Sequence, residues 1–358
     1  INPKLNRTIV TTTIYLASLF LTCNIKKREK EMTAIFSFKF NPAVYRNGVL
    51  SVLILVAYFT GMLEINYQSE DYISNYYSAT SYCVLYHFIF SIGLIYFVLK
   101  LKSKVWNNAL LVLAAVNILL YIAIFFQLSF NEMRENYLIN SSSKSAIFIH
   151  YILLVCLAYF GNVLIKYKNE SSLATIFNHK AALWIFAFCI VYVLSNEVII
   201  HGLMFSSDLI SNAELAKFPI PKPNEYNYQK ELFVDSALSA AKIQIIKIGY
   251  PILWGVLSFV FLIIGIKKQN KQLRIIALSL LGITIVKLFF YDIKNVSETG
   301  KIIAFILLGV LILIISFVYQ KIKKLVVDDI KAEAPEDQKA ADENLSEETK
   351  KPNDEEIN

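Results

Sequence analysis

The chain has 358 residues, of which 56% are hydrophobic and 14% aromatic, and its mean hydropathy is +0.50. This is more apolar material than a soluble core of that length can bury, so the composition excludes an ordinary soluble domain. The net charge of +7 arises from Lys and Arg residues in short connections beside apolar stretches. Such placement is typical of membrane orientation signals, so nucleic acid is a poor explanation of the charge.

Apolar stretches follow one another along the chain, each near the length that a helix needs to cross about 30 Å of hydrocarbon. They are continuous rather than alternating, which favours helices over the strands of a barrel. The sequence therefore predicts an all-α fold, a polytopic transmembrane helical bundle with about nine spans. In chain order the stretches are residues 8–23, 49–65, 83–99, 109–130, 146–165, 181–203, 248–266, 273–291 and 302–319.

The connections between these stretches alternate in their content of Lys and Arg. Six such residues lie between positions 24 and 48, none lies between 66 and 81, and the contrast continues along the chain. By the positive-inside rule this pattern predicts an N-terminus outside and a C-terminus in the cytoplasm. Because the chain begins with Ile1, we expect it to start inside a longer parent or after processing.

Residues 204–247 form the one long connection of the predicted bundle (residues 1–327), and it lies on the outer side. Its prolines favour extended backbone, and apolar residues after Glu231 recur at helical spacing, which predicts a short amphipathic helix on the outer surface. Residues 328–358 contain twelve acidic and four basic residues and no aromatic one, so we expect a disordered cytoplasmic tail. Either the loop or the tail could recruit envelope proteins.

Ionisable residues inside the apolar stretches gather near the predicted outer side. A charge at membrane depth costs roughly 2.5 kcal/mol or more unless it faces the bundle interior or a wet cavity. We therefore predict an outward-facing polar pocket, although residues close to the headgroups could equally be interfacial anchors. Glu197 and His201 are four residues apart and share a helix face, whereas Lys287 and Asp292 do not. The candidates are His87, Glu197, His201, Lys287, Asp292, Glu64 and His150.

Sequence motifs for chemistry are scarce. His87, His150, His201 and Glu197 are chemically a zinc set, but they lack the close ligand spacing that indicates zinc, so no metal is predicted. Phosphate-binding glycine loops and nucleophile motifs are absent from the sequence, so no cofactor is predicted and no catalytic residue is assigned. Whether the chain is an enzyme stays open. The four cysteines lack CxxC spacing and fit buried free thiols.

A set of features recurs in residues 250–321: Leu253-Trp254-Gly255, Gly265, Arg274, Lys287 with Asp292, Gly309 and Tyr319-Gln320. With these features the segment resembles the C-terminal end of a bacterial family of predicted membrane proteins, domain of unknown function 2339. The resemblance implies an integral, multi-pass protein of the bacterial cytoplasmic (inner) membrane. Family members are typically longer, with more helices and often a cytosolic coiled-coil region, which suggests that this chain is a C-terminal portion. The family supplies no activity, substrate or catalytic residue.

Three classes of function fit these observations. The bundle could bind or move a lipid-linked or envelope small molecule through the polar pocket, and this is the class that we favour, because buried ionisable groups need a compensating role. It could instead be a scaffold subunit of an envelope complex. It could also be a membrane enzyme that acts on lipid or glycan at the outer face, with Glu197 or Asp292 as the base. Membrane lipids are the expected partners in each class.

Overall fold

The computed structural model of the chain describes residues 7–26, 33–35, 38–40, 42–100, 104–206, 209–218 and 227–292, and eight single positions between 299 and 317. It divides into two compact units, Ile1–Gly249 and Tyr250–Asn358, and each is described by itself. Within the described ranges the regular structure is helical, apart from an antiparallel hairpin of two three-residue strands, β1 (Thr33–Ile35) and β2 (Phe38–Phe40). The predicted helical class is therefore confirmed.

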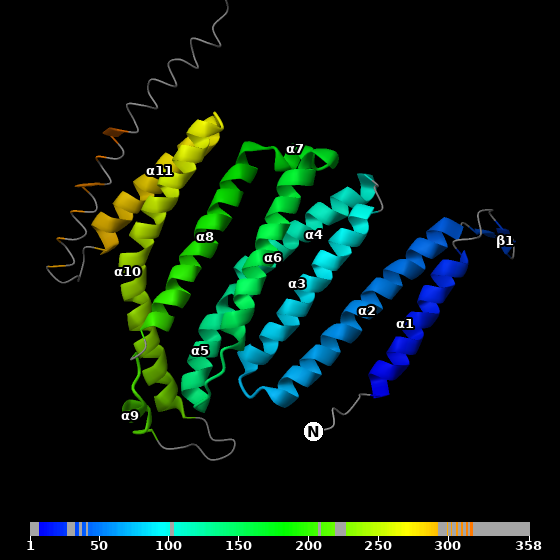
Figure 1. Cartoon of the computed structure of the whole chain (residues 1–358), viewed down its shortest axis with the longest axis horizontal. Helices are drawn as coiled ribbons and strands as arrows, with labels where there is room; N and C mark the ends of the chain where they lie inside the picture. The colour runs from blue at the N-terminus through cyan, green and yellow to red at the C-terminus, as the bar shows by residue number, and fades with distance from the viewer. Residues whose placement is uncertain are drawn as a thin grey trace, which may run out of the picture. The chain divides into compact units, whose positions relative to one another are not determined.

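The first unit is built from long helices joined by short connections. Helices α2, α3, α6 and α8 lie side by side, with α3 and α6 running in one direction and α2 and α8 in the other (Figure 1). Its long helices are α1 (Arg7–Lys26), α2 (Pro42–Tyr72), α3 (Tyr76–Lys100), α4 (Lys104–Ala123), α5 (Leu128–Ile139), α6 (Ser145–Tyr167) and α8 (Lys180–Phe205). Its short ones are η1 (Phe125–Gln127), η2 (Lys168–Glu170), α7 (Ala174–Phe177) and α9 (Asn212–Leu215). Helix α10 (Tyr228–Lys267) crosses into the second unit, which also contains α11 (Lys271–Lys287) and the π-helical η3 (Leu288–Asp292).

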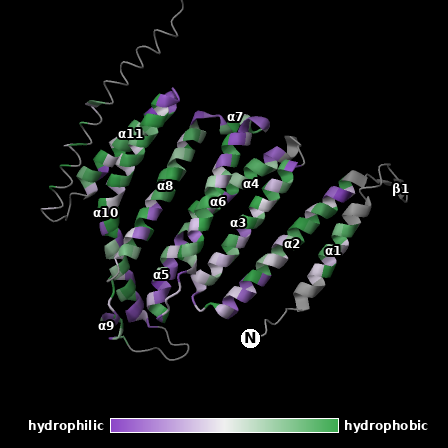
Figure 2. Ribbon diagram, viewed as in Figure 1, coloured by the Kyte–Doolittle hydropathy of each residue, from purple (hydrophilic) through white to green (hydrophobic). Residues whose placement is uncertain are grey.

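Six of the described helices are long and apolar enough to cross a membrane, and a bent pair formed by α4 and α5 raises the number to as many as seven. Figure 2 shows hydrophobic residues along most of α3, α6 and α8, with polar residues toward the helix ends. Helix α1 contributes a shorter apolar segment, Thr12–Leu21, and most of the predicted span 302–319 lies outside the described residues, as does the predicted tail 328–358. The protein is a multi-pass helical membrane protein, while nine spans and their orientation stay predictions.

The predicted span 109–130 does not run straight in the structure. The helix breaks at Ile124, whose φ of −130° and ψ of −54° are not helical, and α4 and α5 meet at a bend of 43°. Helix α5 brings several charged residues to the end of the unit where α2 turns into α3, and two of them, Glu132 and Arg134, bond to α6 and α10.

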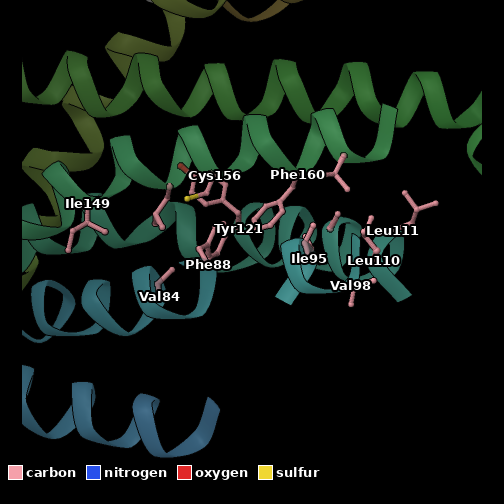
Figure 3. Close-up of a cluster of buried hydrophobic side chains, with 13 residues drawn as sticks. Val84, Phe88, Ile95, Val98, Leu110, Leu111, Tyr121, Ile149, Cys156 and Phe160 are labelled. Atoms are coloured by element: carbon pink, nitrogen blue, oxygen red, sulfur yellow. The ribbon is translucent and has the colours of Figure 1, made fainter. Parts of the chain in front are cut away.

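The core of the first unit lies between α3, α4 and α6 (Figure 3). Buried positions recur on these helices at alternating steps of three and four, which is the spacing of helices that pack at a small crossing angle. The rows are Ser81, Val84, Phe88, Ser91, Ile95 and Val98 on α3, Leu110, Ala114, Asn117 and Tyr121 on α4, and Ile149, Leu153, Cys156, Phe160 and Val163 on α6. Since lipid is as apolar as leucine, this seam is stabilised by close packing and by its small residues rather than by exclusion of water.

Helices α8 and α10 approach each other closely at two glycines in the first unit. A Cβ atom at Gly202 would lie 2.9 Å from the side chain of Ile245, and one at Gly249 would lie 2.4 Å from Cγ1 of Val198. Each glycine therefore makes room for a branched side chain of the other helix. Because Val198 directly follows Glu197, this contact fixes the part of α8 that carries a predicted site residue.

The predicted outer loop, residues 204–247, is shorter in the structure, because α10 already begins at Tyr228. The amphipathic segment expected on the surface is instead the first half of this helix. Arg134 on α5 stabilises it by donating from Nε and Nη2 to the carboxylate of Asp235, at 2.5 and 2.9 Å, and from Nη2 to Glu231. Such bonds between residues about a hundred positions apart cannot be read from local periodicity.

Further polar contacts order the same end of the first unit. Lys230 donates from Nζ to the carbonyl oxygen of Leu138, at 2.8 Å, and to Oδ1 of Asn140, at 3.1 Å. Asn140 ends α5 in the left-handed conformation, with φ of 54°. Helix α9 begins with a capping box, in which the amide and hydroxyl of Ser211 donate to Glu214 and hold the pKa of that carboxyl below its usual value.

Candidate functional site

Two adjacent helices, α6 and α8, exchange hydrogen bonds through four residues that we call the Glu197 cluster: Glu197, His150, Tyr151 and His201. Nε2 of His150, whose side chain is almost fully buried, lies 2.8 Å from Oε2 of Glu197. In the opposite sense, the hydroxyl of Tyr151 on α6 lies 2.9 Å from Nε2 of His201 on α8. Each helix thus contributes one histidine to a partner on the other.

The other ring nitrogen of each histidine is bonded within its own helix. Nδ1 of His150 lies 2.7 Å from the carbonyl oxygen of Ile147, and Nδ1 of His201 lies 2.8 Å from the carbonyl oxygen of Glu197. A carbonyl oxygen only accepts, so both Nδ1 atoms carry a hydrogen. This fixes which nitrogen of each ring faces the partner helix, in the way that a backbone carbonyl orients a metal-bound or catalytic histidine.

The carboxylate of Glu197 is only partly satisfied. Its side chain is 13% exposed, and Oε2 lies 2.8 Å from His150 and 3.7 Å from Nδ1 of His201. Its other oxygen, Oε1, is buried and has no hydrogen-bond partner among the described residues. Tyr121 on α4 lies within electrostatic range of this carboxylate. A buried carboxylate oxygen without a donor is costly.

Of the residues predicted to form a pocket, the structure brings together His150, Glu197 and His201. His87 on α3 is bonded through Nδ1 to the hydroxyl of Tyr58 on α2, at 3.0 Å, and its buried Nε2 has no partner in the part of the chain that the structure describes. Glu64 accepts from Nε2 of Gln68, one turn further along its own helix, at 2.8 Å.

Lys287 and Asp292 belong to the second unit, so their convergence with Glu197 stays a prediction. The ammonium of Lys287 lies 5.5 to 5.9 Å from the ring centres of Tyr250, Trp254 and Tyr291. Aromatic rings around a lysine near a helix end are typical of the membrane interface. Asp292 is the last residue of η3.

Metal ligation can be judged from the described side chains. Among them, no group of three or more His, Cys, Asp or Glu residues is arranged to hold a metal ion. The two histidines that flank Glu197 direct Nε2 to different partners, Oε2 of Glu197 and the hydroxyl of Tyr151. The cluster is therefore an arrangement for hydrogen bonding between α6 and α8.

Sequence reasoning missed a second buried carboxylate, Glu132 on α5, which is 0% exposed. It accepts from the hydroxyl of Ser78 on α3 and from the first backbone amides of α6, those of Ala146 and Ile147, at 2.8 and 3.1 Å. Helix α6 has no cap from its own N-cap side chain, that of Lys144, so Glu132 supplies the cap from another helix. The sequence signal that could have found Glu132 is weak, because it lies in a polar stretch that reads as a loop.

The chain was compared with known proteins. A family model with the description "Predicted membrane protein (DUF2339)" matches residues 6–322. No curated protein and no solved structure matches the chain.

Proposed function

The chain belongs to this family of predicted membrane proteins, and we propose that it binds or moves a lipid-linked or envelope small molecule whose polar group attaches at the Glu197 cluster. The family description names no activity, so the proposal depends on the geometry of the first unit. The bacterial inner membrane, and an outward-facing site, are the setting that the charge pattern favours.

The observation that carries this proposal is the buried Oε1 of Glu197, which has no partner among the described residues. Proteins avoid such atoms because an unsatisfied buried acceptor costs about 1–3 kcal/mol. Oε2 of the same carboxylate is held by His150 from the neighbouring helix. A rigidly held carboxylate with one open acceptor is suited to take a hydrogen-bond donor of a ligand.

The test is to identify what co-purifies with the protein. We would extract it with its surrounding lipid into polymer-bounded discs and identify bound small molecules by mass spectrometry, for the wild type and Glu197→Gln. We expect a compound that is enriched with the wild type and depleted by about tenfold or more in the variant, since a bond to a charged group contributes about 1.5–3 kcal/mol.

Glu70→Gln is the matched control for this experiment. It neutralises another carboxylate of the first unit, but one that was not predicted to line the pocket and whose bond from Asn66 lies within its own helix. The control should retain the compound. Identical profiles for the wild type and both variants would contradict the proposed binding role.

An enzymatic role is the second candidate, because the bond of 2.8 Å between His150 and Glu197 places an acid–base pair inside the bundle. This role predicts that the bound compound is converted. Incubation of the wild-type discs with total lipid extract would then yield a new species that Glu197→Gln discs do not form, whereas a binding or transport protein releases the compound unchanged.

A further inference from the structure

We propose that the Glu197 cluster is an exchange site, at which a proton held by His150 and the cationic group of a ligand compete for the carboxylate of Glu197. This inference rests on the proposed function and adds the class of ligand and its coupling to protons. It follows from the directions of the hydrogen bonds in the cluster, from the open acceptor on Glu197 and from the groups that surround them.

The first step is to locate the proton. Nδ1 of His150 must carry a hydrogen, because it faces the carbonyl oxygen of Ile147 at 2.7 Å. Nε2 of the same ring faces Oε2 of Glu197 at 2.8 Å. Two acceptors do not approach so closely, so one further proton lies between this nitrogen and this oxygen. Whichever atom it is drawn on, the pair of His150 and Glu197 holds a single exchangeable proton and no net charge.

The second step is that His201 needs no charge of its own. It donates from Nδ1 to the carbonyl oxygen of Glu197 and accepts at Nε2 from the hydroxyl of Tyr151. A neutral ring satisfies both bonds. The proton of the cluster therefore belongs to the pair formed by His150 and Glu197.

The third step concerns the other ionisable groups around the cluster. Ionisable groups on the neighbouring helices of the first unit have interactions of their own. They are Tyr121 on α4, within electrostatic range of Glu197, Glu132 on α5, bonded to the first amides of α6, Arg134 on α5, paired with Glu231 and Asp235, Lys242 on α10, 5.0 Å from the ring centre of Phe130, Lys247 on α10, and His87 on α3, bonded to Tyr58. Among the described residues, the ionisable group that lies within hydrogen-bond distance of the Glu197 carboxylate is the ring of His150.

The fourth step gives the class of ligand. A primary ammonium or guanidinium group that donates to Oε1 of Glu197 brings a positive charge beside the carboxylate. The site then holds two cations against one anion, which is unfavourable at low dielectric, so the proton leaves His150 for the solvent as the cation enters. Charge is conserved in this exchange. A neutral donor can bind without releasing a proton, and an anion is repelled by the carboxylate.

The experiment uses three probes with the same twelve-carbon tail and different head groups: dodecylammonium, dodecanol and dodecanoate. Binding to the full chain in lipid discs is measured calorimetrically in two buffers of different ionisation enthalpy, which gives the number of protons released, and empty discs correct for partition into lipid. We expect dodecylammonium to bind with release of one proton. Glu197→Gln should weaken this binding by about tenfold or more and abolish the proton release, while Glu70→Gln should retain both.

Several results would overturn the exchange. These are dodecylammonium binding without proton release, equal binding to Glu197→Gln, preference for dodecanol or dodecanoate, and no binding of any probe. In each of these results the proposed function still stands if a compound co-purifies with the wild type and is lost from Glu197→Gln. The proposed function is contradicted together with the exchange only if the co-purification profiles of the wild type and Glu197→Gln are also identical.

Discussion

Two buried carboxylates of the first unit, Glu132 and Glu197, have opposite surroundings. Glu132 is fully buried and accepts from three donors, the hydroxyl of Ser78 and the amides of Ala146 and Ile147. Glu197 is slightly exposed, shares Oε2 with His150 and leaves Oε1 without a partner in the described chain. Both carboxylates join neighbouring helices, yet only in Glu132 do both oxygens accept hydrogen bonds from described residues.

This difference separates a structural role from a functional one. The partners of Glu132 are a hydroxyl and two backbone amides, so this carboxylate caps α6 and stabilises the fold. The partner of Glu197 is an imidazole, which can gain or lose a proton near neutral pH. A glutamate therefore caps a helix at position 132, whereas at position 197 a glutamate accepts a hydrogen bond from a group that can change its protonation.

The sharpest test of the comparison makes the same substitution at both positions, and the larger effect is expected at Glu132. In Glu132→Gln one carboxylate oxygen is replaced by an NH₂ group. If the NH₂ takes the place of Oε1, it faces the Ser78 hydroxyl and the Ala146 amide; if it takes the place of Oε2, it faces the Ile147 amide. In either orientation a hydrogen-bond donor faces another donor. We expect a loss of about 2–4 kcal/mol in the free energy of unfolding, because buried donors are left unsatisfied. Thermal unfolding in detergent, followed by circular dichroism, would measure it; a variant as stable as the wild type would refute the cap.

An intermediate effect is expected where α10 supports the helix of Glu197. Gly249→Ala places a methyl group 2.4 Å from Cγ1 of Val198, whose β-branched side chain cannot rotate away freely. We expect a loss of about 1–2 kcal/mol after the gain in helix propensity of alanine over glycine. The double variant Gly249→Ala with Val198→Ala should recover most of the lost free energy of unfolding in the same measurement. If it recovers none, the destabilisation by Gly249→Ala does not come from a clash with Val198.

The smallest effect on stability is expected for Glu197→Gln. The new amide can donate from Nε2 to a neutral His150, so the bond between α6 and α8 survives while the exchangeable proton is lost. We expect a change of less than about 1 kcal/mol in the free energy of unfolding, in contrast to the loss at Glu132. A loss as large as that of Glu132→Gln would mean that Glu197 is itself a structural residue.

The sequence predicted what depends on local periodicity and composition. The helical class, the membrane setting, and the shared face of Glu197 and His201 follow from apolar stretches and from spacing along one helix. The placement of His150 on the predicted outer side follows from the alternation of the connections. Each of these predictions depends on a residue pattern within one helix or on the number of charged residues in a connection between helices.

The remaining features depend on contacts between distant residues. The bonds of Arg134 to Glu231 and Asp235 extend α10 into the predicted loop, and the bend at Ile124 depends on what α5 meets in space. The role of Glu132 depends on donors that lie before and after it in the chain. Periodicity within a window of about 18 residues carries no information on such pairs.

The cap of α6 has a consequence for how the chain assembles. A helix that starts with unpaired amides cannot enter hydrocarbon without a penalty of several kcal/mol for each unsatisfied group. Lys144 provides no side-chain cap, and the acceptor at the start of α6 is Glu132 of the preceding helix. We therefore expect α6 to be inserted stably only once α5 is in place, because the earlier helix supplies the acceptor for the first amides of the later one.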